Sequence, residues 1–365
     1  MSLAKILAPM AAAAAALAAV PAAAQTYSTF DPIQFPGAGS TLPLAINDMG
    51  QIVGEVTGGA AQPPLVLNGQ DFWTTGFELD AGLYSLLYYP AAQITGANPG
   101  WPAGSANGIN VYGEVVGGYA TTASDAHGYA EQNGVYTSLG FAPAPDNFTP
   151  QGINDLGVTD GTCTNCVAGE SSSAYIDDNG AITLLNVNGD GGATTAGGIN
   201  NAGEVIVDTA AGTSMLYSAG AFTSIDLYGA EETIATAVNN EDIIVGSYED
   251  GSGLWHGFVD NAGIFSTVDD PLGVDGTMIT GINDQNQIVG SYIGADGVAN
   301  GFTATADVQE PASVVLFGTS LIGLGWLWRR KGRPAASRAR QPGREPEADV
   351  VSPAFENWAR LPVSR

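Results

Sequence analysis

Positively charged side chains are missing from most of the chain. Between Lys5 and Arg329 the 365-residue sequence contains no lysine or arginine, yet this stretch holds 33 of the 37 acidic residues. A body without cations cannot neutralise phosphates, which argues against nucleic acid as a partner. It also has no arginine to clamp phosphate or carboxylate ligands, which argues against kinases, NTPases and dinucleotide-dependent enzymes. Metal ions and neutral sugars suit such a surface better.

Cysteine and histidine are scarce, with two of each. Cys163 and Cys166 form a C-x-x-C segment, but a zinc site would need two further ligands and a redox motif would begin a helix. In an exported chain we expect a disulfide that closes a small loop. His127 and His256 each precede a glycine-aromatic step, so we expect packing roles in two different repeats and no shared catalytic site.

The first 24 residues predict a secretory signal peptide. Lys5 supplies the positive N-region, residues 6–20 are apolar and rich in alanine, and residues 22–24 are three alanines before Gln25. Small residues at that place are typical of a cleavage site. We therefore expect the mature chain to begin near Gln25 and to be exported.

The C-terminal region contains three segments in a fixed order. Glu310-Pro311 is followed by the uncharged residues 312–328 and then by the basic residues Arg329, Arg330 and Lys331. Seventeen helical residues span roughly 25 Å, the short limit for a membrane helix. The basic cluster should remain cytoplasmic. A polar tail, residues 334–365, completes the chain.

This order resembles the PEP-CTERM sorting signal of Gram-negative bacteria that produce exopolysaccharide, with Gln309 where that motif has its first proline. The resemblance covers residues 309–333 and implies an exosortase-type sorting machinery as a partner, with a membrane span at 312–328. An ordinary C-terminal membrane anchor is the alternative interpretation.

One short segment recurs six times in residues 25–308. An asparagine preceded by Ile or Val returns at spacings of 63, 44, 46, 39 and 44 residues, and Gly, Asp or Asn stands three residues later. Those residue types tolerate the positive φ of a tight hairpin turn, and an asparagine side chain can cap its own turn. We expect these asparagines to be structural, with a ligand-facing role as the alternative. They are Asn47, Asn110, Asn154, Asn200, Asn239 and Asn283.

Each unit of about 44 residues contains about four short strands, and no long amphipathic helix is visible. This pattern predicts an all-β fold, a β-propeller with six four-stranded blades. A degenerate seventh blade around residues 90–106 is the alternative. Residues 27–31 resemble residues 265–269, so we expect the N-terminal strand to complete the last blade against residues 300–304.

The repeats resemble bacterial extracellular HAF-type repeat proteins, which often carry PEP-CTERM signals. Trp255-His256-Gly257-Phe258, running on to Ile282-Asn283-Asp284, is the copy most similar to that pattern. The resemblance covers most of residues 26–305 and implies a secreted propeller, without an agreed activity.

Acidic pairs occur at several expected turns. A glycosidase would need two carboxyl groups about 5–10 Å apart. Calcium could relieve the repulsion between carboxylates, but no segment has the full twelve-residue calcium loop. The residues that offer oxygen ligands for calcium are Asp177-Asp178, Asp269-Asp270 and Asp190.

From these features we expect a non-catalytic binding or structural module of the cell envelope or extracellular matrix, with polysaccharide as a candidate partner and no obligatory cofactor. A carbohydrate-active enzyme, with carboxylates near the propeller axis, is the competing hypothesis. A calcium-linked surface protein is a third. Two carboxylates that converge in one pocket with a perturbed pKa would favour the enzyme.

Overall fold

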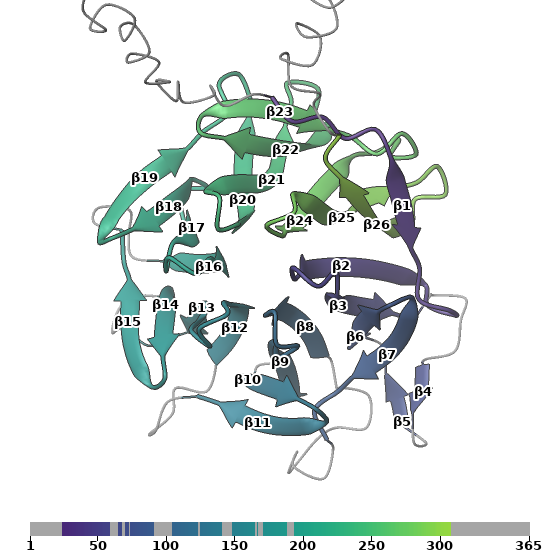
Figure 1. The fold of residues 1–365 in the computed structure, drawn as a ribbon, viewed down its shortest axis with the longest axis vertical. Coiled ribbons are helices and arrows are strands. Elements are labelled where there is room, and N and C mark those ends of the chain that lie inside the picture. The colour runs from purple at the N-terminus through teal and green to yellow at the C-terminus, as the bar shows by residue number, and fades with distance from the viewer. Residues whose placement is uncertain are drawn as a thin grey trace, which may run out of the picture. The chain divides into compact units, whose positions relative to one another are not determined.

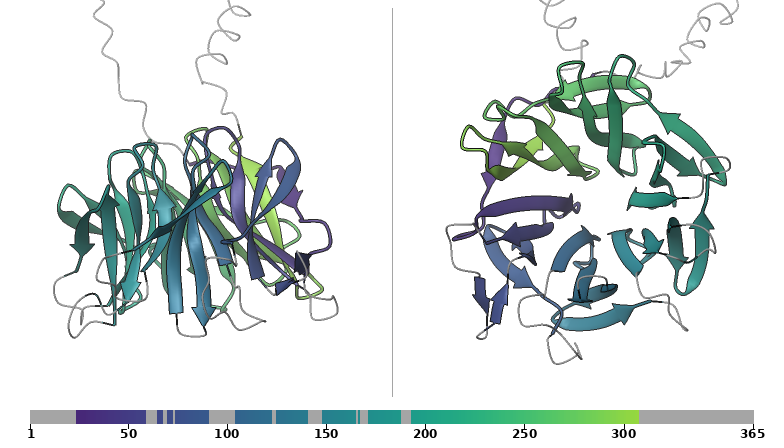
Figure 2. Two further views of the ribbon diagram at one scale, coloured as in Figure 1. Left: turned by 90° about the horizontal axis from the view of Figure 1, so that it is seen from below. Right: turned by 180° about the vertical axis from the view of Figure 1, so that it is seen from behind.

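The computed structural model contains a closed ring of six four-stranded antiparallel sheets (Figure 1). It describes residues 24–58, 65–67, 70–72, 74–90, 104–122, 125–140, 148–164, 166, 171–187 and 193–307. The sheets stand side by side around a common axis, and each sheet runs from the axis outward (Figure 2). The predicted six-bladed propeller with four strands per blade is therefore confirmed.

The strands follow the sequence repeat closely. Blades 1 to 3 contain β2(Ser40–Ile46), β3(Ile52–Thr57), β6(Thr74–Asp80) and β7(Leu83–Leu87); β8(Gly104–Ile109), β9(Val115–Thr122), β10(Asp125–Gln132) and β11(Val135–Leu139); and β12(Phe148–Ile153), β13(Thr159–Thr164), β14(Ser172–Asp178) and β15(Ala181–Leu185). Blades 4 to 6 contain β16(Thr194–Ile199), β17(Val205–Thr209), β18(Ser214–Ser218) and β19(Ala221–Ile225); β20(Glu232–Val238), β21(Ile243–Glu249), β22(Trp255–Asn261) and β23(Ile264–Val268); and β24(Thr277–Ile282), β25(Gln287–Ile293) and β26(Ala299–Thr305).

The N-terminal strand closes the ring. β1(Phe30–Ile33) pairs antiparallel with β26, with Phe30 opposite Ala304 and Ile33 opposite Gly301. The predicted closure is confirmed, but the paired strand begins three residues later than expected. The preceding residues are held differently: the Tyr27 hydroxyl donates to the backbone oxygen of Asn286 at 3.2 Å. This pairing covers the edge of β26 and gives blade 6 its fourth strand.

The described residues of the long interval between the first two asparagines form no seventh blade. A small hairpin, β4(Leu65–Leu67) with β5(Gln70–Phe72), is inserted between the second and third strands of blade 1. Residues 104–106, which belong to the proposed extra blade, are the start of the innermost strand of blade 2. The seventh-blade alternative is therefore wrong.

Small residues allow the six innermost strands to approach one another at the axis. Each of these strands has a register shift, as between Ala106 and Gly108 or between Pro150 and Gly152. A Cβ atom on Gly108 would lie only 2.8 Å from the Cα atom of Gly152 in the next blade. The bulged glycine thus sets the close spacing of neighbouring blades.

Apolar side chains fill the spaces between blades. Clusters of buried apolar residues span neighbouring blades. In one of them, Val53 of blade 1 packs with Ala106 and Val115 of blade 2. Within the described part of the chain, no helix is long and apolar enough to cross a membrane. The predicted signal peptide, residues 1–24, is outside the described residues except for Ala24. The predicted sorting and membrane segment, residues 309–333, and the tail, residues 334–365, lie entirely outside them.

Candidate functional site

The six repeated asparagines meet around the propeller axis. Each is buried, with a relative exposure of 3–5%. In every turn the side-chain Oδ1 atom accepts two backbone N–H groups, from the second and fourth residues after the asparagine; for Asn239 these are Glu241 and Ile243, at 3.0 and 2.9 Å. These bonds fix the hairpin turn that the sequence predicts.

The same side chains also connect every blade to the next. Each Nδ2 atom donates to the backbone oxygen of the following asparagine, at distances between 2.8 and 3.4 Å. The last of these bonds runs from Asn283 to Asn47, so the circle is complete. We call this set the asparagine ring. Its side chains are engaged with backbone groups of the protein, as a structural role requires.

A second circle of polar groups lies beside the asparagine ring, at the residue after each asparagine. In five of six steps a side-chain oxygen accepts the backbone N–H of the preceding blade; Asp48, for example, accepts from Asp284 at 2.8 Å. Val111 interrupts this circle because a valine has no acceptor. We call the six residues the rim. They are Asp48, Val111, Asp155, Asn201, Asn240 and Asp284.

Three carboxylates of the rim face a small hollow at the mouth of the channel. Burial raises the pKa of Asp48, and the backbone N–H of Asp284 lowers it in part. The side-chain hydrogen bond to Asp284 and the negative charges of Asp284 and Asp155 raise it further. One carboxyl group with a raised pKa thus lies beside two other carboxylates at the axis. However, the hollow measures about 80 Å³, far below the several hundred Å³ of ordinary ligand pockets. Asp48 and Asp284 also touch each other, closer than the carboxyl pair of a glycosidase.

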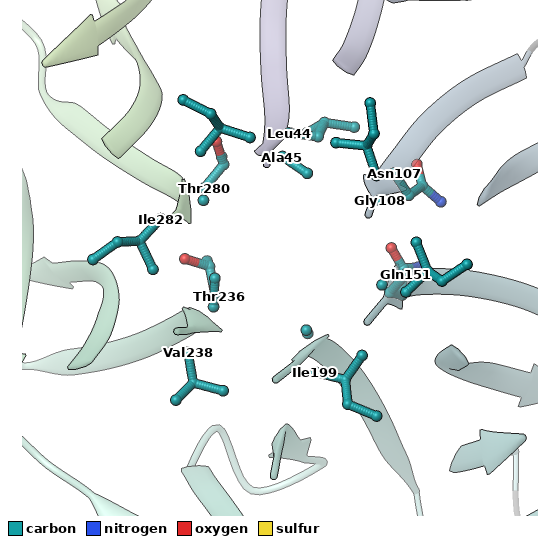
Figure 3. A pocket seen from close by; sticks show the side chains of 18 residues that line it. Leu44, Ala45, Asn107, Gly108, Gln151, Ile199, Thr236, Val238, Thr280 and Ile282 are labelled. Atoms are coloured by element: carbon teal, nitrogen blue, oxygen red, sulfur yellow. The ribbon is translucent and has the colours of Figure 1, made fainter. Parts of the chain in front are cut away.

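The channel behind the rim is equally narrow. Its cavity of about 90 Å³ is bounded by the bulged segments of the six innermost strands (Figure 3). Two of its polar side chains already have protein partners: the Thr236 hydroxyl donates to the oxygen of Ile279 at 2.9 Å, and the Thr280 hydroxyl donates to that of Pro43 at 2.7 Å. The axis is therefore a structural centre with no room for a sugar ring.

Blade 3 contains an unusual buried acid. Asp160 is fully buried where the other blades carry valine or isoleucine, and neither carboxyl oxygen makes a well-formed hydrogen bond with the described residues. Burial raises the pKa of Asp160 to about 7, although backbone N–H groups of Asp160 and Gly152 lower it in part. The sequence marks Thr159-Asp160 as a break in the repeat but gives no sign of this depth of burial.

His256 is held between two carboxylates in blade 5. Its Nδ1 atom lies 3.0 Å from Asp269 and its Nε2 atom 3.3 Å from Asp250. Burial lowers the pKa of His256, but hydrogen bonds to Asp269 and Asp250 and their charges outweigh this and raise it. The ring also stacks on Tyr248, with centroids 5.1 Å apart. The equivalent His127 packs on Tyr119 at 5.2 Å, in another blade.

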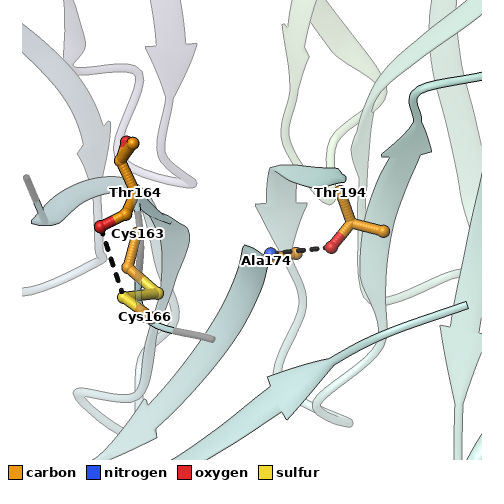
Figure 4. Close-up of a disulfide and its surroundings, with 5 residues drawn as sticks. All are labelled: Cys163, Thr164, Cys166, Ala174 and Thr194. Atoms are coloured by element: carbon orange, nitrogen blue, oxygen red, sulfur yellow. Dashed lines mark hydrogen bonds between the residues drawn. A yellow bond between two sulfur atoms is a disulfide. The ribbon is translucent and has the colours of Figure 1, made fainter. Parts of the chain in front are cut away.

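The two cysteines form a disulfide at the outer end of β13 (Figure 4). Their Cα atoms are 5.9 Å apart, and Cys163 is buried against Phe148 and Tyr175. The sulfur atoms are thus part of the packing of blade 3. Such a bond persists in oxidising compartments.

The carboxylates considered for calcium serve their own turns. Asp177 accepts the N–H of Gly180 at 2.6 Å, and Asp270 accepts that of Leu272 at 2.8 Å. Asp269 pairs with His256, and Asp190 is outside the described residues. No group of three His, Cys, Asp or Glu side chains in the described segments could hold a metal ion. The sorting residues Glu310, Pro311, Arg329, Arg330 and Lys331 also lie outside these segments.

Comparisons with known proteins concern the fold alone. The sequence matches no protein-family profile and no curated protein. Among solved structures, TolB from Acinetobacter baumannii is 13% identical with a TM-score of 0.48, over 72% of this chain and 66% of that chain. The fucose-specific lectin from Aleuria aurantia is 9% identical with a TM-score of 0.44, over 74% and 97% of the two chains. A gluconolactonase from Xanthomonas campestris is 11% identical with a TM-score of 0.42, over 79% and 99%.

Proposed function

We propose that this chain is an exported, non-catalytic binding propeller of the cell envelope or extracellular matrix, sorted through its C-terminal segment. The narrowness of the axis is the observation that carries the binding assignment. The rim and channel offer hollows of about 80 and 90 Å³, and the asparagine ring is fully engaged with backbone groups. The hollow that the rim carboxylates line is therefore too small for a sugar ring, while the outer surface stays available for binding.

The sequence and the buried disulfide support the exported location. Residues 1–24 have the pattern of a signal peptide, and residues 309–333 resemble a sorting signal. A disulfide such as Cys163–Cys166 forms and persists in an oxidising compartment. The acidic body, with no lysine or arginine between residues 6 and 328, suits neutral partners such as polysaccharide better than anionic ones.

Expression of the full chain with an epitope tag in a Gram-negative host that has an exosortase system tests the location. We expect mass spectrometry to find a mature N-terminus near Gln25 and cell fractionation to recover the chain outside the cytoplasm. Replacing Arg329, Arg330 and Lys331 with glutamine should impair sorting, whereas the matched tail variant Arg360→Gln should not. An intact Met1 in the cytoplasmic fraction would contradict the proposal.

A second experiment tests the absence of catalysis. The purified full chain should co-sediment with the neutral polysaccharide of the same host without releasing reducing ends. The contact between Asp48 and Asp284 is the one feature that favours the enzyme alternative. If reducing ends appear, and Asp48→Asn or Asp284→Asn abolishes their release while the loop variant Asp275→Asn does not, the chain is an enzyme.

A further inference from the structure

A cavity larger than the two at the axis lies elsewhere in the ring. It measures about 380 Å³ and is formed where blades 1, 2 and 3 meet, toward the end of β8 opposite its asparagine turn. Its volume falls within the range of small-molecule pockets. Its side-chain polar groups come from Glu55 and Thr74 of blade 1, Ser105 and Tyr119 of blade 2, and Thr149 of blade 3.

The cavity exists because blade 2 lacks a side chain that other blades have. Gly104 pairs with Tyr119 at a register position that holds a buried threonine in four other blades and Phe148 in blade 3. A Cβ atom on Gly104 would meet only the oxygen of Gly118, at 3.4 Å, so its backbone does not require glycine. The four threonines are Thr41, Thr194, Thr233 and Thr277.

A second glycine of blade 2, Gly118, lines the pocket with its backbone. Gly118 occupies the register position that holds Glu55 in blade 1 and a hydroxyl or carboxyl residue in each remaining blade. In other blades this side chain can bond to the next innermost strand; Ser247, for example, accepts the N–H of Ile279 at 3.2 Å. Blade 2 has no such side chain, and a Cβ atom on Gly118 would lie 3.1 Å from the Cγ2 atom of Thr149, so Thr149 of blade 3 takes its place.

Glu55 gives the cavity its electrostatic character. Its carboxyl group is half-buried, makes no hydrogen bond or ion pair with the described residues, and has its pKa raised by burial. No lysine or arginine occurs within the body to neutralise it. A partly desolvated carboxylate without a donor is unfavourable, so a ligand that brings hydroxyl or ammonium donors gains the most from binding here.

The surrounding groups favour hydroxyl donors. Ser105, Thr74 and Thr149 can both donate and accept, which matches the hydroxyl groups of a sugar ring. An ammonium ligand would benefit from an open aromatic face. The Tyr119 ring already stacks on Tyr89, with centroids 4.1 Å apart, and packs on His127.

We propose that this cavity, which we call the Glu55 pocket, binds one residue of a neutral saccharide, with Glu55 accepting hydrogen bonds from ring hydroxyl groups. The proposal rests on the non-catalytic binding function above and gives it a site and a ligand class. The pocket lies outside the axis, so occupancy does not involve the rim carboxylates.

Ligand-observed NMR and calorimetry on the full chain test the pocket with D-glucose, D-galactose, D-mannose and L-fucose, and with butylamine as the ammonium probe. We expect at least one sugar to bind in the millimolar range. Glu55→Gln should weaken it by about tenfold, because a charged acceptor is lost. Gly104→Thr should abolish it by restoring the side chain of four other blades. Asp208→Asn, which changes the equivalent carboxyl of blade 4, should leave binding unchanged.

Melting curves establish that each variant is folded, and Gly104→Ser is the smaller filling variant if Gly104→Thr is not. Three results would overturn the proposal: no sugar binds the unaltered chain, sugar binding survives both Glu55→Gln and a filled pocket, or butylamine binds and no sugar does. If polysaccharide still co-sediments with a filled pocket, the Glu55 pocket is wrong while the binding function stands. Release of reducing ends would instead contradict the binding function.

Discussion

The two ends of the blades differ in how faithfully they repeat. At the asparagine ring all six blades present the same side chain with the same three hydrogen bonds. At the opposite end the blades present threonine, glycine or phenylalanine at one register position, and a cavity of about 380 Å³ opens beside Gly104. The uniform end holds the ring together through bonds between neighbours. The variable end can therefore change side chains without breaking the circle, and that is where a binding site can form.

The largest expected effect comes from breaking the asparagine ring. Asn239→Ala removes four hydrogen bonds, two of them buried, and should lower the free energy of unfolding by about 3–5 kcal/mol, measured by urea denaturation. The neighbouring rim variant Asn240→Ala, at an exposed residue, should cost about 1 kcal/mol or less. Equal losses at the two residues would mean that the ring has no special role.

The buried carboxyl group of Asp160 in β13 should lower the stability of the protein. Its folded pKa of about 7 exceeds the ordinary value of 3.8, so the folded state favours the protonated carboxyl group. The stability of the protein should therefore fall as the pH rises from about 4 to about 7, and stay lowered above that range. Asp160→Val, which restores the apolar residue of the other blades, should stabilise by about 3 kcal/mol at pH 8.

The gain from Asp160→Val should shrink as the pH is lowered toward 4, and melting curves across this range measure it. The exposed turn variant Asp178→Asn is the control for the loss of one negative charge. A gain for Asp160→Val that is the same at pH 8 and pH 4 would show that the carboxyl group does not titrate in this range.

His256 provides a smaller, pH-dependent effect at the variable end. Its pKa is raised above the ordinary 6.5, so its contacts stabilise the fold fully below that value and lose their effect as the pH rises through the folded pKa. We expect His256→Gln to cost about 0.5–1 kcal/mol near pH 5.5 and less near pH 8.5. A double-mutant cycle with Asp269→Asn should recover this coupling, and additive losses would refute the ion pair.

The last prediction is that a missing hydrogen-bond acceptor can be added to the rim. Val111 is the one rim residue without an acceptor, so the N–H of Asp48 lacks the partner that each other blade provides. Val111→Asn should supply it and stabilise the protein by about 0.5–1 kcal/mol in urea denaturation. Val111→Ala removes the same apolar side chain without adding an acceptor, and an equal change in both variants would contradict the prediction.

Much of the fold is visible in the sequence because it depends on local chemistry. An asparagine followed three residues later by Gly, Asp or Asn specifies a turn wherever it stands, and Gly50, Asp242 and Asn286 do adopt positive φ values of 78°, 60° and 59°. Six such turns and a matching N-terminal strand were sufficient to predict six blades and ring closure. The register of closure was placed three residues early because the similarity of residues 27–31 to residues 265–269 does not define where pairing begins.

The candidate site follows from contacts that no local pattern contains. The asparagine ring requires the spacing of neighbouring blades, and the Glu55 pocket is lined by residues of three blades. Asp160 is buried beside Gly152 and Tyr175, which lie outside the turn that the sequence predicts. Local turn chemistry thus determined the number and shape of the blades, since each turn is stabilised within a few residues. Tertiary structure decided which side chains meet, because those distances arise only when segments far apart in the chain are brought together by closure of the ring.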